Sequence, residues 1–266
     1  LSDDRIECGI ESSLEDIVSN PYIICEQYSG IDPDDFISFR KIDNGMLPSP
    51  ELGLEHLTAV DDARRLRALI VERLSFETQH SFVSTVKILG DINSKLEYLP
   101  EWKQARFSAK YLEVDEEYIG EAVVFRNKEN EKFLYLKKVY ENERSIEKQI
   151  RELVTRPDIE IKRPVTEEFF NSVLYDSDCT LARKVPEGYE KAIEGQVEVC
   201  SSLFLKPLSV VSGSAGTGKT FIISAIIKAI EKAHGEGVSF HLLAPTGKAT
   251  DRIREKTGKP ANTIHH

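Results

Sequence analysis

Eight residues near the end of the chain have the types and spacing needed to hold a triphosphate. They read Gly213, Ser214, Ala215, Gly216, Thr217, Gly218, Lys219 and Thr220, which satisfies the pattern G-x-x-x-x-G-K-[ST]. Glycines let successive backbone N–H groups point inward at phosphate oxygens, in conformations that a Cβ would obstruct. Lys219 places a positive charge at the β- and γ-phosphates, and the Thr220 hydroxyl can occupy one position on Mg²⁺. The motif therefore predicts a P-loop that binds a nucleoside triphosphate with Mg²⁺, with Lys219 and Thr220 as catalytic residues.

An accidental match in a glycine-rich turn is the alternative, and the flanking pattern argues against it. Residues 208–212 form a short apolar run typical of a strand, and residues 220–234 have the helical period with a broad isoleucine face. Gly235 and Gly237 end that helix, and residues 238–243 read as the next strand. Strand, helix and strand predict a βαβ unit, and with it an α/β P-loop NTPase fold built on a parallel sheet.

A second motif follows the second predicted strand. Residues 243–249 read Leu-Ala-Pro-Thr-Gly-Lys-Ala and place a polar turn at the carboxyl end of a strand, where α/β sheets bind ligands. Thr246 could donate a hydrogen bond to a phosphate oxygen, or it could simply cap the following helix, and the residues leave both readings open. Lys248, Arg252 and Arg254 could line the path of a nucleic-acid strand, although charges on an exposed helix are more often only solvated.

The first part of the chain has a mainly helical pattern. Ser12 with Glu15 predicts a capping box, and Asp32 followed by Pro33 predicts another helix start. Two longer helices are predicted from apolar residues at helical spacing. Their apolar positions are Leu66, Leu69, Ile70 and Leu74 in one helix and Val86, Leu89, Ile92 and Leu96 in the other.

A β-hairpin is predicted after these helices, from strand-like runs at residues 122–126 and 132–136 around the turn residues 127–130. Helices followed by a hairpin resemble a winged-helix module. The charged run at residues 141–151 predicts a solvated helix face, and a proline-flanked stretch at residues 155–164 predicts a boundary. We therefore expect a mainly helical domain at 1–155, a linker and helix at 156–187, and a P-loop domain from 188 to 266.

Charge is divided unevenly along the chain, whose net charge is −10. From residue 188 onward there are 10 Lys and Arg against 7 Asp and Glu, a net charge of +3, so the preceding residues have a net charge of −13. Such acidity disfavours contact with duplex DNA, so the first 155 residues are expected to dock a protein partner first and to contact DNA second. The second part still allows a narrow basic channel for a single strand.

Targeting and metal signals are lacking in the sequence. The cysteines Cys8, Cys25, Cys179 and Cys200 are scattered without a C-x-x-C pair, which gives little support to metal ligation. No apolar stretch approaches the roughly 20 residues that span a bilayer, and the first ten residues lack a signal-peptide pattern. We expect a cytoplasmic protein with no membrane partner.

Together, these segments resemble the RecD-like helicases of superfamily 1, which include the alpha subunit of exodeoxyribonuclease V. The resemblance runs through the P-loop, the segment 244–249, Thr257-Gly258-Lys259-Pro260 and Thr263-Ile264-His265, and covers about the last 80 residues. A weaker similarity to the helical N-terminal region of longer members runs through residues 20–22, 31–45 and 79–83. The motifs agree with the family in order and in spacing.

The resemblance implies roles for further residues. Pro245, Thr246, Gly247 and Lys248 would form the DNA-contacting motif Ia. Gln196, which lies 17 positions ahead of Gly213, would pair with the donor and acceptor edges of adenine, although a glutamine on a helix is more commonly just solvated. The fold implied is the first part of a RecA-like motor domain.

The activity implied is that of an ATP-dependent DNA helicase of recombination and repair, moving 5′ to 3′ on single-stranded DNA or a single-strand/duplex junction. Hydrolysis also requires an acidic pair and arginines that would follow residue 266, so the chain alone is expected to bind nucleotide without hydrolysing it efficiently. One alternative is a signalling P-loop ATPase regulated by a winged-helix module. Another is a binding module whose first 155 residues recognise a protein.

Overall fold

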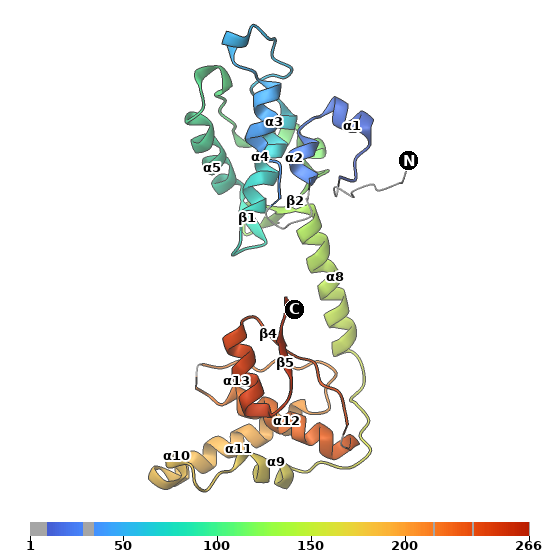
Figure 1. Ribbon diagram of the computed structural model, residues 1–266, viewed down its shortest axis with the longest axis vertical. Helices are drawn as coiled ribbons and strands as arrows, with labels where there is room; N and C mark the ends of the chain where they lie inside the picture. The colour runs from blue at the N-terminus through green and yellow to red at the C-terminus, as the bar shows by residue number, and fades with distance from the viewer. Residues whose placement is uncertain (1–9, 29–34, 215, 236, 266) are drawn as a thin grey trace. The chain divides into compact units, whose positions relative to one another are not determined.

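The computed structural model describes residues 10–28, 35–214, 216–235 and 237–265. Contacts divide the chain into two compact units, Leu1–Ile146 and Glu147–His266, and each unit has a core of its own. Figure 1 labels the helices and strands of both units. The division falls within helix α8 (Lys137–Val154), earlier than the expected boundary at residue 155. The domain boundaries predicted at residues 155 and 187 stay predictions.

The first unit is built around two amphipathic helices, as its apolar periodicity predicts. In α4 (Ala63–Ser75) the four predicted apolar positions are all buried, and the side chain of Asp62 caps the helix by accepting from the Arg64 backbone N–H at 2.8 Å. In α5 (Thr85–Glu97) Val86 is 75% exposed, and Ile88 occupies the core instead. The unit's other helical segments are α1 (Leu14–Ser19), α2 (Ile23–Gln27), α3 (Phe39–Met46), α6 (Ala109–Val114), α7 (Glu116–Ile119) and the 3-10 turns Pro50–Leu52 and Glu101–Lys103.

The capping box of the first helix lies one residue later than the sequence predicts. Ser13 rather than Ser12 is the N-cap of α1, and its hydroxyl accepts from the Asp16 backbone N–H at 3.1 Å. The Asp16 carboxylate accepts in return from the Ser13 backbone, so the motif needs Asp16 where the prediction used Glu15. The predicted helix start at Asp32 and Pro33 lies outside the described residues.

Three antiparallel strands close the first unit in the order β1-β3-β2: β1 (Phe82–Ser84), β2 (Val123–Lys128) and β3 (Glu131–Leu136). The predicted hairpin is present as β2 and β3, with Val124 opposite Tyr135. Its turn residues Glu129 and Asn130 have φ values of 51° and 67°, as a two-residue type I′ turn requires. The turn is shorter than predicted because the strands continue to Lys128 and from Glu131.

A buried ionic cluster lies in the core of the first unit. Asp43 accepts from Arg65 Nε at 2.7 Å and from the Tyr22 hydroxyl at 2.8 Å, and Lys103 Nζ lies 3.4 Å from its other oxygen. Arg65 is fully buried and Lys103 is 5% exposed. A single carboxylate therefore compensates two buried cations, and burial lowers the pKa of Lys103 although Asp43 opposes that shift.

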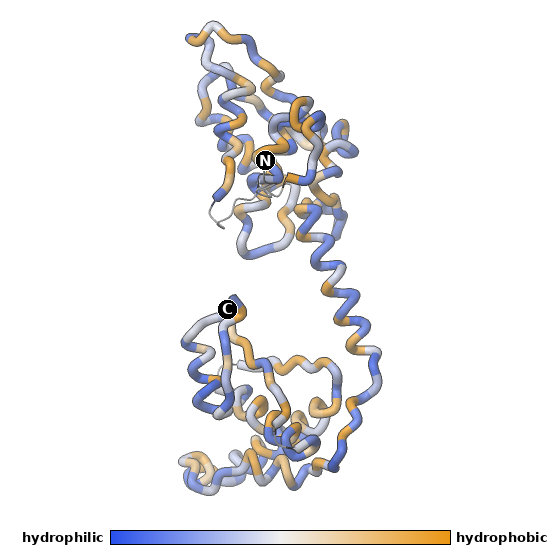
Figure 2. Tube along the Cα trace, turned by 45° about the vertical axis from the view of Figure 1, so that its right-hand side comes forward, coloured by the Kyte–Doolittle hydropathy of each residue, from blue (hydrophilic) through white to orange (hydrophobic). Residues whose placement is uncertain are grey.

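Helix α8 is polar on most of its surface, as the charged run predicts, and none of its residues is buried. Figure 2 shows hydrophilic positions interspersed with hydrophobic ones along it. None of the helices in the described part of the chain is long and apolar enough to cross a membrane.

Helices form the core of the second unit. The apolar faces of α9 (Glu167–Leu174), α11 (Pro186–Leu203) and α12 (Lys219–His234) bury Phe170, Val197 and Ile222 among others. The isoleucines of α12 differ in burial, since Ile222 and Ile227 are buried and Ile223 is exposed. The remaining elements are α10 (Thr180–Lys184), β4 (Leu242–Ala244), α13 (Gly247–Thr257) and β5 (Ala261–Thr263).

A parallel βαβ unit is present, one element later than predicted. β4 pairs in parallel with β5, with Leu242 opposite Ala261, and α13 makes the crossover. Residues 208–212 have no strand pairing, so the strand predicted before the P-loop is not formed, and Val210 is 81% exposed. The strand predicted at 238–243 is reduced to β4, because a strand requires a hydrogen-bonded neighbour and β5 supplies only three residues.

Candidate nucleotide-binding site

The P-loop lies at the end of the segment that connects the core helix α11 to α12, and two of its glycines have a left-handed backbone. Gly216 and Gly218 both have φ of +84°, in the left-handed region that side chains disfavour. Gly218 is the N-cap of α12, so the positive end of the helix dipole begins at the loop. The Thr217 hydroxyl donates to the Ser214 carbonyl at 3.0 Å and closes the loop on itself.

Lys219 turns its ammonium back over the loop. Its Nζ lies 2.6 Å from the Gly213 carbonyl oxygen and 2.7 Å from that of Ser214, so both carbonyls accept hydrogen bonds from it. Because the residue is in the first turn of α12, the helix holds the charge close to the glycines. This arrangement places a cation and the helix N-terminus at one loop, the combination that binds a phosphate anion.

Gln196 extends from α11 to the same loop. Its Nε2 donates to the Thr217 carbonyl oxygen at 3.4 Å, and a Cβ built on Gly218 would lie only 2.5 Å from that nitrogen. The positive φ of Gly218 therefore favours glycine, and a side chain at this position would also displace the flexible end of Gln196. The motif pattern accounts for the first effect, whereas the second depends on a contact with another helix that the motif does not contain.

Thr220 and Ala215 are two further residues of the P-loop motif. Thr220 is half-buried in the first turn of α12, next to Lys219, and its predicted contact with Mg²⁺ stays a prediction. Ala215 lies outside the described residues. Within the part of the chain that the structure describes, no group of three or more His, Cys, Asp or Glu side chains could hold a metal ion by itself.

The second motif forms the exposed turn between β4 and α13. Thr246 is the N-cap of α13, and its hydroxyl accepts from the Ala249 backbone N–H at 3.3 Å, which is the capping alternative left open by the sequence. Pro245, Thr246, Gly247 and Lys248 are all exposed.

Arg254, which the sequence offered as a phosphate contact, instead has a structural role. Its Nε donates to the Ala261 carbonyl oxygen at 2.9 Å and ties α13 to β5. This use leaves less of its guanidinium for a phosphate.

Two side-chain contacts join α12 to the end of α13 and to the residues that follow it. The Ser224 hydroxyl donates to the Lys256 carbonyl oxygen at 3.3 Å, and Lys259 forms an ion pair with Glu231. The structure brings Gln196 to the P-loop.

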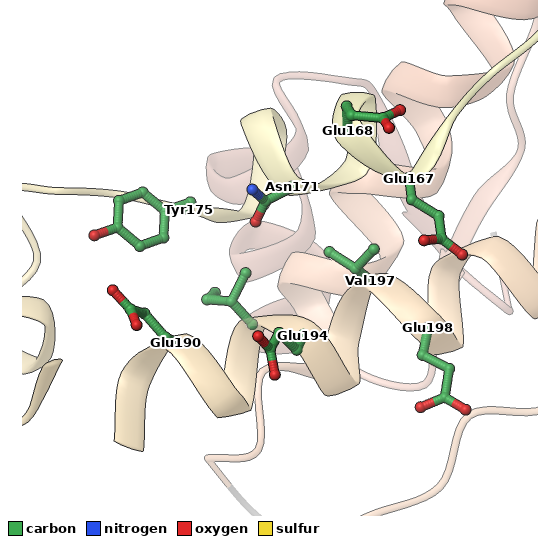
Figure 3. A pocket seen from close by; sticks show the side chains of 9 residues that line it. Glu167, Glu168, Asn171, Tyr175, Glu190, Glu194, Val197 and Glu198 are labelled. Carbon is green, nitrogen blue, oxygen red and sulfur yellow. The ribbon is translucent and has the colours of Figure 1, made fainter. Parts of the chain in front are cut away.

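An open groove of about 680 Å³ lies between α9 and α11, away from the P-loop motif. Figure 3 shows Glu190, Glu194 and Glu198 of α11 along one side, opposite Glu167 and Tyr175. No described P-loop residue lines it. Such a concentration of carboxylates repels a triphosphate, so this groove is a poor nucleotide site despite its size.

Comparison with known proteins identifies the class of this site. A family model described as an AAA domain matches residues 196–266, a segment that begins at Gln196 and includes the whole P-loop. The second unit therefore contains a P-loop NTPase domain of mixed α/β structure.

Curated relatives narrow the comparison. An uncharacterised protein, MJ1519 of Methanocaldococcus jannaschii, is 29% identical over 95% of this chain and 22% of its own length. The ATP-dependent RecD2 DNA helicase of Deinococcus radiodurans is 27% identical over 83% of this chain and 29% of its own length. The RecBCD enzyme subunit RecD of Haemophilus influenzae is 32% identical over 28% of this chain and 12% of its own length.

These comparisons confirm the resemblance to RecD-like superfamily 1 helicases, at modest identity over part of the chain. The chain spans less than a third of the length of each of these relatives.

Proposed function

We propose that residues 213–220 bind the phosphates of ATP and that the protein uses this ATP to translocate along and unwind DNA. The observation that carries the proposal is the joint placement of Lys219, the N-terminus of α12 and two left-handed glycines at one loop. Each of these features favours an anion, and together they match a triphosphate better than a single phosphate. When bound, Mg²⁺ would sit between Thr220 and the phosphates and neutralise their charge.

Gln196 is the residue that we propose to select adenine. Its amide lies at the edge of the P-loop, where a base attached to the bound phosphates could reach it, and an amide offers both a donor and an acceptor. Gln196→Glu would keep the size and remove the donor, so it should lower the preference for ATP over other nucleoside triphosphates.

We further propose that the exposed turn at Pro245, Thr246, Gly247 and Lys248 contacts single-stranded DNA. These residues follow the carboxyl end of β4 and continue into the first turn of α13, and their exposure leaves Lys248 accessible to a phosphate. The proposal also includes a RecA-like sheet in the second unit and a winged-helix-like fold of the first unit. The short parallel pair β4-β5 and the strand order β1-β3-β2 after α4 support them.

The same proposal includes movement in the 5′ to 3′ direction, a role in recombination and repair, and a cytoplasmic location. They rest on the similarity to the RecD2 and RecD proteins named above. A protein partner bound through the acidic first unit is also proposed, on the basis of its net charge.

Nucleotide binding can be tested on these 266 residues with a fluorescent ATP analogue and Mg²⁺. Lys219→Ala should weaken binding roughly tenfold or more, because a hydrogen bond to a charged group contributes about 1.5–3 kcal/mol. Lys228→Ala is the matched control, since Lys228 is an exposed lysine on the same helix α12. Equal affinity of the two variants would contradict the proposed site.

Coupling to DNA is tested by the ATPase rate of the full-length protein with and without a single-stranded oligonucleotide. We expect strong stimulation that Lys219→Ala abolishes. A rate that does not respond to DNA would instead favour a signalling ATPase.

A further inference from the structure

The outer face of the sheet in the first unit carries an aromatic cluster that the proposed ATPase does not use. Successive residues of a strand point to opposite faces. Val83 and Leu134 are buried on the face that packs against α4 and α5. Phe82, Phe133 and Tyr135 belong to the alternate set and point away from that core.

The rings of this set contact one another in a continuous row. The ring centroids of Phe82 and Phe133 lie 5.3 Å apart, those of Phe82 and Tyr135 lie 5.0 Å apart, and Tyr135 continues to Tyr140 of α8 at 5.4 Å. Phe82 is 36% exposed, and the other three rings are half-buried. We call Phe82, Phe133, Tyr135 and Tyr140 the aromatic face.

Arginines lie over the aromatic face. The guanidinium carbons of Arg126 and Arg144 are 4.8 and 5.4 Å from the centroid of the Tyr140 ring, and Arg126 also donates to the Tyr140 hydroxyl. Arg126 is exposed and lies directly opposite Phe133 in the sheet. Planar cations over the half-buried Tyr140, in a row of rings that ends at the exposed Phe82, form a surface to which bases and phosphates can bind together.

Basic residues outnumber acidic ones in the segment that carries most of this face. Residues 122–144 contain six Lys or Arg against four Glu, in the part of the chain whose first 187 residues have a net charge of −13. Of the six, Lys132 belongs to the opposite side of the sheet and forms an ion pair with Glu116. Lys128 lies opposite Glu131 in the hairpin and is partly neutralised by it, whereas Lys137 and Lys138 are exposed at the start of α8. The acidity that argued against DNA contact therefore does not extend to this face.

We propose that the aromatic face binds single-stranded DNA, with a base stacked on Phe82 and phosphates contacted by Arg126 and the nearby lysines. The bases must be unpaired, because the bases of duplex DNA are already stacked on one another. The acidic surroundings also repel a second strand. This inference does not depend on the P-loop, since all of its residues belong to the first unit.

Binding is measured by fluorescence anisotropy of a labelled oligo(dT) with the full chain. Phe82→Ala should weaken it roughly fivefold or more, because stacking on an aromatic ring contributes about 1–3 kcal/mol per base. Arg126→Ala should also weaken it and lower the slope of affinity against salt concentration by about 1. Matched controls are Phe76→Ala, a phenylalanine that is 62% exposed, and Arg106→Ala, an exposed arginine, both in the first unit but off this face.

Phe82→Trp distinguishes a loss of stacking from a folding defect, because tryptophan keeps an aromatic surface at position 82. The chain has one natural tryptophan, Trp102, whose signal in the unchanged chain is the baseline. We expect Phe82→Trp to bind oligo(dT) with unchanged or higher affinity and to add fluorescence that the oligonucleotide quenches. Circular dichroism of every variant verifies its fold.

The proposal would be overturned if Phe82→Ala and Arg126→Ala both left the affinity for oligo(dT) unchanged, or if Phe76→Ala and Arg106→Ala lowered it equally. It would also be overturned if oligo(dT) quenched no added fluorescence in Phe82→Trp, or if the chain bound oligo(U) more tightly than oligo(dT). Because Lys248 is a separate proposed DNA contact, each measurement is repeated with Lys248→Ala, and the loss caused by Phe82→Ala should persist. ATP-analogue binding should be unchanged in Phe82→Ala, so failure here is distinguishable from failure of the nucleotide site.

Discussion

At the scale of single residues, Gly216 and Gly218 separate two reasons for a glycine in the P-loop. Both have φ of +84°, but a Cβ on Gly216 would meet nothing within 4 Å, whereas a Cβ on Gly218 would meet the Gln196 amide. The pair therefore provides an internal comparison between backbone conformation and side-chain contact.

We predict that Gly216→Ala and Gly218→Ala each cost about 1–2 kcal/mol of stability from the left-handed backbone alone. Gly218→Ala should carry a further cost of about 0.5–1.5 kcal/mol, the contribution of the Gln196 hydrogen bond that it displaces, and this cost should disappear in the Gln196→Ala background. Denaturant unfolding of the two double-mutant cycles measures this coupling. A cycle with Gly216 that couples to Gln196 as strongly as the cycle with Gly218 would refute the contact, since independent sites add within roughly 0.3–0.5 kcal/mol.

At the scale of an element, the start of α13 shows how one threonine can serve structure and a proposed DNA contact at once. Thr246 caps the helix through a hydrogen bond to the Ala249 backbone, and its exposure leaves the other side of the hydroxyl open to a ligand. Substitutions that retain or remove the cap can therefore separate the two roles.

Thr246→Ala should destabilise the second unit by roughly 0.5–2 kcal/mol, and Thr246→Asn should retain the stability, because asparagine is also a good N-cap. Thermal unfolding monitored by circular dichroism provides the measurement. If DNA affinity falls in both variants while stability falls only in Thr246→Ala, the hydroxyl contacts DNA directly. Equal stability of Thr246→Ala and the unchanged chain would show that the cap contributes nothing.

At the scale of the whole molecule, two separate cores are the main feature. The residues of the first core all precede residue 135, and those of the second all follow residue 169. Each core buries its own apolar residues, so each unit is expected to unfold as its own cooperative transition.

Asp43→Asn should lower the free energy of unfolding of the first unit by about 3–5 kcal/mol, and with it the temperature of that unit's transition. The substitution leaves the buried Arg65 and Lys103 without a carboxylate. The second transition should stay unchanged. Asp178→Asn is the matched control, since its ion pair with Arg183 is largely exposed and should contribute little. Differential scanning calorimetry of the full chain checks this, and a joint shift of both transitions by Asp43→Asn would contradict independent cores.

Local features were predictable from the sequence because the residues that determine them are close together in the chain. The P-loop conformation depends on glycines within a few residues of Lys219, the hairpin depends on two adjacent runs around a turn, and the buried face of α4 depends on helical spacing. The predicted strand at residues 208–212 was wrong for a related reason, because its apolar composition was suitable but strand formation also needs a pairing neighbour.

Other features were decided by tertiary structure alone. The contact of Gln196 with Gly218, the exchange of Val86 for Ile88 in the core, and the row of rings from Phe82 to Tyr140 join residues that are distant in the chain or depend on how a helix is rotated. Averaged over the first two-thirds of the chain, the charge indicated a surface unsuited to DNA. The folded sheet collects Arg126 and the aromatic face on one side, because strand pairing selects which side chains share a surface.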